Sequence, residues 1–148
     1  MPSFKFRLQP VLAQRERDEK DRMRVVAELE SRRMQIEDDI RASQGRIVEG
    51  RRAVAQALSG GRVDLGAAKL GSAATMRHDQ DARRGVLEMA AVINQLESAR
   101  NELIQASARR RAIELLRDRA LERHLDEEKR RENNAMDDLM VMRRAEGA

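Results

Sequence analysis

The stretch RMRVVAELESRRMQIEDDIRASQGRIVEGRRAVAQAL, residues 22–58, decides the fold that the sequence predicts. Its seam of apolar side chains alternates spacings of three and four residues, at Val26, Leu29, Ile36, Ile40, Ile47, Val54 and Ala57, with Arg33, Ser43 and Gly50 in the remaining slots. A mean repeat of 3.5 residues keeps one face of a helix against a partner helix over many turns. The stretch therefore predicts a long coiled-coil helix.

The same seam continues backwards to Leu12, through Arg22, Glu19 and Arg15. Because Pro10 is tolerated in a first helical turn, the first helix is expected at about 10–58. At 1.5 Å per residue, such a helix is about 70 Å long. Residues 1–9 are expected to form an extended lead-in that places the only two aromatic side chains, Phe4 and Phe6, on one side.

A glycine-rich break follows the first helix. Ser59-Gly60-Gly61 is expected to end the helix, because glycine favours the left-handed conformation of a C-terminal cap. Asp64 is a suitable N-terminal cap for a new helix. Gly66, Gly71 and Gly85 then interrupt a stretch whose alanines offer little to bury. Residues 59–85 are therefore interpreted as a hinge with weak helix, less stable than either arm.

A second long helix is expected at about 86–144. Its seam is predicted at Val92, Leu96, Ala99, Leu103, Ala106, Ile113 and Ala120, and it then passes into a shifted register at Leu121, Leu125, Glu128, Glu132, Ala135, Leu139 and Met142. A change of this kind near residues 116–121 is typical of a stutter, which alters supercoil winding locally.

Two arms of similar length joined by one break predict an all-α fold, an elongated two-helix antiparallel coiled-coil hairpin. The whole chain, residues 1–148, is expected to form this single coiled-coil domain. A parallel dimer of one continuous helix is the alternative, and Ser59-Gly60-Gly61 makes it costly.

The composition restricts the partners that the chain can have. Of its 148 residues 38% are charged and 1% are aromatic, which is typical of a long helix rather than a globular core. The 30 basic and 26 acidic residues are interleaved, which disfavours a nucleic-acid partner despite a net charge of +4. Cysteine is absent, and no run of eighteen apolar residues could insert into a membrane, so a cytoplasmic protein is expected.

No group of residues resembles a catalytic, cofactor or metal site, so we expect no enzyme. His78 and His124 are 46 positions apart in charged surroundings. Neighbouring carboxylates such as Asp137 and Asp138 point about 100° apart on a helix, and solvated charge explains them. Residues 66–72 approach a phosphate-binding loop, but Ser72 stands where that motif needs lysine.

Two stretches carry a resemblance to a known family. Residues 4–16, FKFRLQPVLAQRE, resemble the opening of FliJ, a protein of the bacterial flagellar export apparatus. Residues 112–119, AIELLRDR, with the charged residues that follow up to Arg143, look like the second helix of that family. The resemblance implies a coiled coil similar in shape to the central stalk of rotary ATPases, without hydrolytic activity of its own. It also implies a cytoplasmic protein peripherally associated with the flagellar basal body at the inner membrane.

The resemblance further implies three partners: the hexameric flagellar export ATPase, the cytoplasmic side of the membrane export gate, and export chaperones. We expect the ATPase to contact a set at both ends of the chain: Phe4, Phe6, Arg7, Leu8, Gln9, Leu12, Arg15, Asp137, Asp138 and Arg143. The alternative for Phe4 and Phe6 is that the rings fold back to cover the end of the coil.

Gate contact is assigned to Leu70, Ala74 and Met76, although the family commonly carries aromatic residues just after the hinge and this chain does not.

Three other functions remain open on the sequence. They are the corresponding stalk protein of a virulence type III secretion system, a basic coiled-coil protein that binds nucleic acid, and a spacer without an ATPase partner. Steep loss of nucleic-acid affinity with salt would favour the second.

Overall fold

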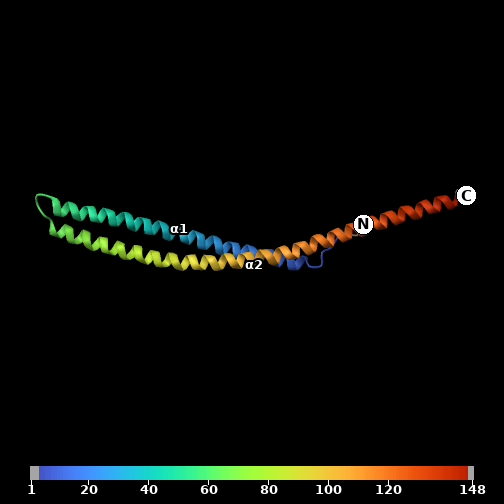
Figure 1. Cartoon of the computed structure of the whole chain (residues 1–148), viewed down its shortest axis with the longest axis horizontal. Helices are drawn as coiled ribbons and strands as arrows, with labels where there is room; N and C mark the ends of the chain where they lie inside the picture. Colours follow the sequence, from blue (N-terminus) through green and yellow to red (C-terminus); the bar gives the residue numbers. More distant parts are fainter. Residues whose placement is uncertain (1–3, 147–148) are drawn as a thin grey trace. The chain divides into compact units, whose positions relative to one another are not determined.

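The computed structural model describes residues 4–146, which form two helices, α1 (Gln9–Ser59) and α2 (Leu65–Glu146) (Figure 1). Residues 1–3 of the predicted lead-in lie outside the described residues. Residues 4–146 contain no strand, and the two helices pack together as a hairpin. The predicted all-α helical hairpin is therefore confirmed.

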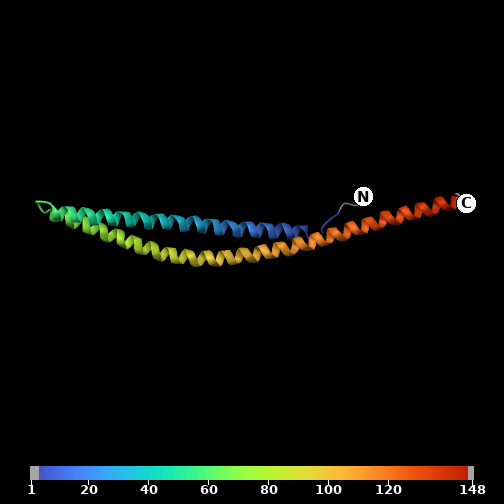
Figure 2. The ribbon, with the colours of Figure 1, turned by 45° about the horizontal axis from the view of Figure 1, so that its top comes forward.

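The chain divides into two units, to each of which both helices contribute. The hairpin unit is Arg22–Glu102, and the terminal unit consists of Met1–Asp21 and Leu103–Ala148. In the hairpin unit α1 and α2 run side by side in both views (Figure 1 and Figure 2).

Asp64 organises the connection between the helices. Its backbone N–H donates to the Ala57 carbonyl at 3.1 Å, and its Oδ1 accepts from the Ala67 N–H at 3.0 Å. The second bond satisfies a free donor of the first turn of α2, so the predicted N-terminal cap is confirmed. The expected left-handed cap at Gly60 and Gly61 was wrong, because no glycine within residues 4–146 has a positive φ. Instead, the Asp64 N–H satisfies a carbonyl in the last turn of α1.

An apolar core holds the hairpin unit together. Ile36 of α1 and Val92 and Leu96 of α2 are buried, and partly buried side chains pack around them: Val26, Leu29, Ile40 and Met89. Every residue of the predicted seam between Val26 and Ala57 is buried or half-buried, including Ser43 and Gly50. The period of 3.5 residues therefore identified the face of α1 that packs on α2.

The structure differs from the sequence interpretation between residues 65 and 85, where α2 is already helical. The buried and half-buried positions there keep the spacing of three and four that leads to Met89: Ala68, Gly71, Thr75, His78, Ala82 and Gly85. A Cβ at Gly71 would lie 2.9 Å from Val54 Cγ2, and one at Gly85 would lie 2.7 Å from Ile40 Cγ1. These glycines thus allow close approach of the two helices, instead of acting as breaks.

In the terminal unit, residues 9–21 of α1 pack on the part of α2 that begins at Leu103. Leu12 is fully buried, and Ala106 is buried. The predicted register shift at Leu121 was wrong for the packing of the two helices, because the seam keeps its spacing: Arg110, Ile113, Arg117, Ala120 and His124 are half-buried. The hydrocarbon parts of arginine side chains and the histidine ring can cover the surface of a partner helix. The packed face of α2 therefore does not have to shift to Leu121 and Leu125.

Candidate protein-binding surfaces

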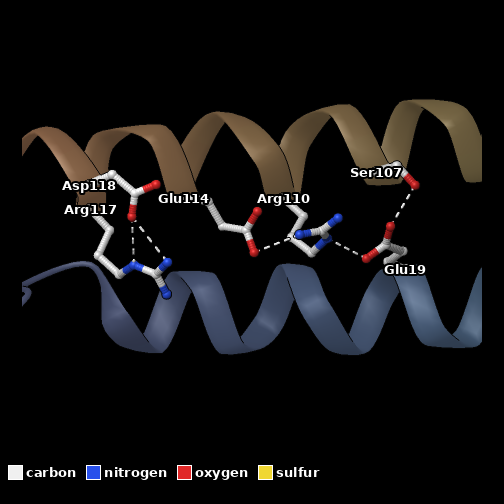
Figure 3. A network of polar contacts seen from close by, with 6 residues as sticks. All are labelled: Glu19, Ser107, Arg110, Glu114, Arg117 and Asp118. Carbon is white, nitrogen blue, oxygen red and sulfur yellow. Dashed lines mark hydrogen bonds and ion pairs between the residues drawn. The ribbon is translucent and has the colours of Figure 1, made fainter.

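A network of charged side chains occupies the seam of the terminal unit (Figure 3). Glu19 of α1 accepts a hydrogen bond of 2.6 Å from the Ser107 hydroxyl and forms an ion pair with Arg110. Arg110 also pairs with Glu114 at 2.6 Å, one turn further along α2. The guanidinium therefore lies between two carboxylates, one from each helix, which compensates for placing charge in a coiled-coil seam.

The network changes the protonation equilibria of its members. The hydrogen bond from Ser107, helped by Arg110 and opposed by burial, lowers the pKa of Glu19 below its ordinary value. Hydrogen bonds to Glu19 and then Glu114 raise the pKa of Arg110. In the hairpin unit, burial raises the pKa of Glu30, but hydrogen bonds from Arg100 and Arg33 outweigh it and lower the pKa overall. All three groups are therefore held in their charged forms.

The lead-in lies against α2 beyond the start of α1. The rings of Phe4 and His124 have centroids 5.6 Å apart and planes inclined by 44°, and both Phe4 and Phe6 are half-buried. The Phe4 ring therefore packs against α2, as the alternative expects of the two rings. A contact of this kind between two rings stabilises the position of the segment that carries Phe4.

The predicted ATPase-contacting residues fall into two groups. Near the start of α1, Arg7, Leu8 and Gln9 are exposed and Arg15 is half-buried. Leu12 is fully buried, so its side chain is not accessible to a partner protein. The second group, Asp137, Asp138 and Arg143, is exposed near the end of α2. Asp137 follows His124 by 13 residues, or about 20 Å along the helix. The structure therefore does not bring the two groups together.

The end of α2 has an exposed surface all round. Every residue from Lys129 to Ala145 is exposed, including five large apolar side chains, Met136, Leu139, Met140, Val141 and Met142. In both views no other segment of residues 4–146 in the terminal unit runs beside this last part of α2 (Figure 1 and Figure 2). Apolar side chains gathered among charges are a usual feature of protein-binding surfaces.

A second apolar surface lies in the hairpin unit, beside the connection. Leu70 and Met76 are exposed, Leu70 by 75%, and Ala74 is exposed as well. Near the connection, a groove of about 490 Å³ is lined by other residues of both helices: Val54, Leu58, Leu65, Gly66, Ala68, Lys69 and Ser72. The predicted gate-contacting residues are therefore exposed, and none of the three lines this groove.

Within residues 4–146, no group of three or more histidine and carboxylate side chains is placed to hold a metal ion. None of the helices described is long and apolar enough to cross a membrane.

Comparison with known proteins decides the family. The family model described as Flagellar FliJ protein matches residues 4–147, nearly the whole chain. The chain belongs to the FliJ family. This FliJ-family protein is therefore a component of the flagellar export apparatus, which is a type III secretion system, and its family comprises structural and escort proteins. No curated protein and no solved structure matches the chain.

The sequence analysis of this FliJ-family protein missed two features. One is the small-residue seam from Ala68 to Gly85, which could have been found by continuing the spacing of three and four backwards from Val92. The other is the apolar groove beside Leu65, for which the sequence carried no signal, because a groove depends on how two helices meet.

Proposed function

We propose that this protein acts as a central-stalk-like coiled coil of the flagellar export apparatus. It binds the hexameric export ATPase and links it to the export gate and to export chaperones, on the cytoplasmic side of the inner membrane at the basal body. The observation that carries the proposal is the match of the FliJ family model to residues 4–147. The flagellar role is favoured over a virulence secretion system because the matching family is the flagellar one.

The exposed C-terminal part of α2 supports contact with the ATPase. Asp137, Asp138 and Arg143 stand free among exposed methionines and Leu139, so charge and apolar area are available together. Large apolar side chains that are already solvent-exposed gain most from a partner that covers them. Arg7, Leu8 and Gln9 form the other part of the proposed contact.

The surface beside the connection supports contact with the export gate. Leu70, Ala74 and Met76 are proposed to meet the gate through their exposed side chains. Aliphatic groups would then replace the aromatic residues that other family members commonly carry after the connection. Chaperone contact follows from family membership alone, and no residues are assigned to it.

Stimulated ATP hydrolysis tests the ATPase contact. The full-length chain should raise the hydrolysis rate of its cognate hexameric export ATPase. An Asp138→Ala/Arg143→Ala variant should lose at least half of this stimulation, because its charges lie in the proposed contact. The matched control is Glu97→Ala/Arg109→Ala, which removes one exposed acidic and one exposed basic residue outside the proposed contact.

The control variant should stimulate hydrolysis like the unaltered protein. Equal stimulation by both double variants would remove Asp138 and Arg143 from the contact, and no stimulation by the unaltered chain would reject the ATPase partner. For the gate, a pull-down with the cytoplasmic part of the gate protein should weaken with Leu70→Asp and stay unchanged with Leu87→Asp, an equally exposed leucine of α2. Full binding of Leu70→Asp would exclude this surface.

A further inference from the structure

One heptad pattern in α2 is not the pattern through which α2 packs on α1. Seven residues alternate spacings of four and three over three heptads: Leu121, Leu125, Glu128, Glu132, Ala135, Leu139 and Met142. We name this set the C-terminal seam. Four of the seven are large apolar side chains, two at each end of the set, and Glu128 and Glu132 occupy the centre. A coiled-coil face needs a partner helix to bury it.

The apolar members of the C-terminal seam lie away from the seam that faces α1. That seam reaches Ala120 and His124, which are half-buried, whereas Leu121 and Leu125 come one residue later and point about 100° away. The four large apolar members of the C-terminal seam are exposed, from 38% at Leu121 to 63% at Met142. Nothing in residues 4–146 covers these four side chains.

The two glutamates in the centre of the seam require positive charge on the partner that covers them. Glu128 contacts His124 at 3.4 Å, and within residues 4–146 Glu132 forms no ion pair. Burying a carboxylate in a coiled-coil interface without a cation is unfavourable. Lys129 and Arg131 flank the two glutamates, so in its central heptad the face is acidic in the middle and basic at the edges, whereas Glu122 and Asp138 flank its outer heptads.

The same charges argue against a second copy of this chain as the occupant. A parallel pair in register would set Glu128 against Glu128 and Glu132 against Glu132. An antiparallel pair would set Glu128 against Glu132, or would bury each glutamate against an apolar side chain. Each arrangement leaves carboxylates uncompensated, which disfavours the pairing.

We propose that the C-terminal seam binds an amphipathic helix of another protein. The apolar stripe of that helix carries lysine or arginine opposite Glu128 and Glu132, and its flanking positions are acidic, opposite Lys129 and Arg131. Leucine and methionine side chains supply the apolar contact, and the two carboxylates set which helix is accepted. Which protein supplies this helix rests on the proposed function. That the seam binds a helix of this kind does not.

Two synthetic peptides of three heptads test the proposal. The basic-seam peptide carries leucine in its stripe, lysine at the two central stripe positions and glutamate at the flanks. The acidic-seam peptide is identical except for glutamate at those two positions. Each is made in both sequence orders, so that parallel and antiparallel pairing are sampled. Binding of the labelled peptides to the full-length chain is measured by fluorescence anisotropy.

We expect the basic-seam peptide to bind at least tenfold more tightly than the acidic-seam peptide. Leu125→Asp/Leu139→Asp should weaken its binding at least tenfold, and Glu128→Lys/Glu132→Lys should reverse the preference between the peptides. Glu132 is exposed and Glu128 is half-buried beside His124, so circular dichroism checks that the charge reversal leaves the fold intact. Val141→Asp, exposed but outside the seam, is the matched control and should bind as the unaltered chain does.

Equal affinity for the two peptides, or no binding of either, would overturn the proposal. So would a dimer of the unaltered chain in analytical ultracentrifugation that Leu139→Asp abolishes, since the occupant would then be a second copy. If the peptides behave as expected but the chain does not stimulate the ATPase, the proposed function fails and the seam stands. If stimulation is normal and neither peptide binds, the seam proposal alone fails.

Discussion

Gly85 of α2 lies directly against Ile40 of α1: a Cβ at Gly85 would be 2.7 Å from Ile40 Cγ1 and 3.4 Å from Ile40 Cδ1. The isoleucine thus occupies the space that a side chain at Gly85 would need. The same relation recurs between Gly71 and Val54, and between Gly50 and Thr75. Large side chains of one helix facing glycines of the other allow the backbones to approach closely within the hairpin unit.

Gly85→Ala should therefore destabilise the protein, although alanine is the better helix former by about 1 kcal/mol. The added methyl group meets the root of a β-branched side chain, which cannot move aside cheaply, and overpacking of this kind costs about 1–3 kcal/mol. The net loss should be about 1 kcal/mol in the free energy of unfolding, measured by urea denaturation.

Gly45→Ala is the matched control for this substitution. Gly45 is an exposed residue of α1, and a Cβ there has nothing within 4 Å. The same change should stabilise the protein by about 0.5–1 kcal/mol. Stabilisation by both substitutions would contradict the close packing at Gly85.

Acid should weaken the terminal unit through Glu19. The pKa of this carboxyl is lowered in the folded chain from the ordinary value of 4.5, so its contribution to stability is present above that value. The contribution is lost as the pH falls through the lowered pKa. The thermal midpoint should therefore drop between about pH 6 and about pH 3, and it should drop less in Glu19→Gln, which keeps the acceptor for Ser107.

The exposed carboxylate Glu49 provides the control for this acid response. Glu49→Gln should follow the unaltered protein across the same pH range, with thermal unfolding monitored by circular dichroism. Identical curves for Glu19→Gln and the unaltered protein would show that the network of Glu19, Ser107 and Arg110 does not contribute to stability.

Ile36→Ala should cost about 2–4 kcal/mol in the free energy of unfolding, because Ile36 is buried against Val92 and Leu96 and leaves a cavity. Leu87→Ala is the matched control, since Leu87 lies on the same hairpin unit but is 73% exposed. It should change stability by less than about 0.5 kcal/mol. Similar losses in both variants, measured by urea denaturation, would contradict a core confined to the seam.

Asp64→Ala should destabilise the start of α2 by about 1 kcal/mol, since it removes the acceptor for the Ala67 N–H. Asp64→Ser keeps a capping oxygen and should lose less than half as much. Amide hydrogen exchange should show faster exchange at Ala67 and Ala68 in the alanine variant only. Unchanged exchange at both amides would exclude a capping role for this side chain.

The sequence predicted the packed face of α1 because that face is marked by Val, Leu and Ile at a regular period, which can be read without knowing the partner. The corresponding face of α2 between Ala68 and Gly85 is made of small residues. Such residues carry no hydrophobic signal, and they were interpreted as a weak hinge. Their role depends on Val54 lying opposite Gly71, on Ile40 lying opposite Gly85 and on Thr75 lying opposite Gly50 of α1. Only the packed pair of helices supplies these contacts.

The candidate surfaces divide in the same way. From the sequence alone came the two-helix fold, the capping residue, the family resemblance and the heptad pattern that ends at Met142. The tertiary structure alone decided that α1, 51 residues long, leaves the last part of the 82-residue α2 exposed, and that Leu12 is buried while Leu139 is free. The physical reason is that periodicity states which side chains share a face of a helix, whereas burial depends on what lies against that face.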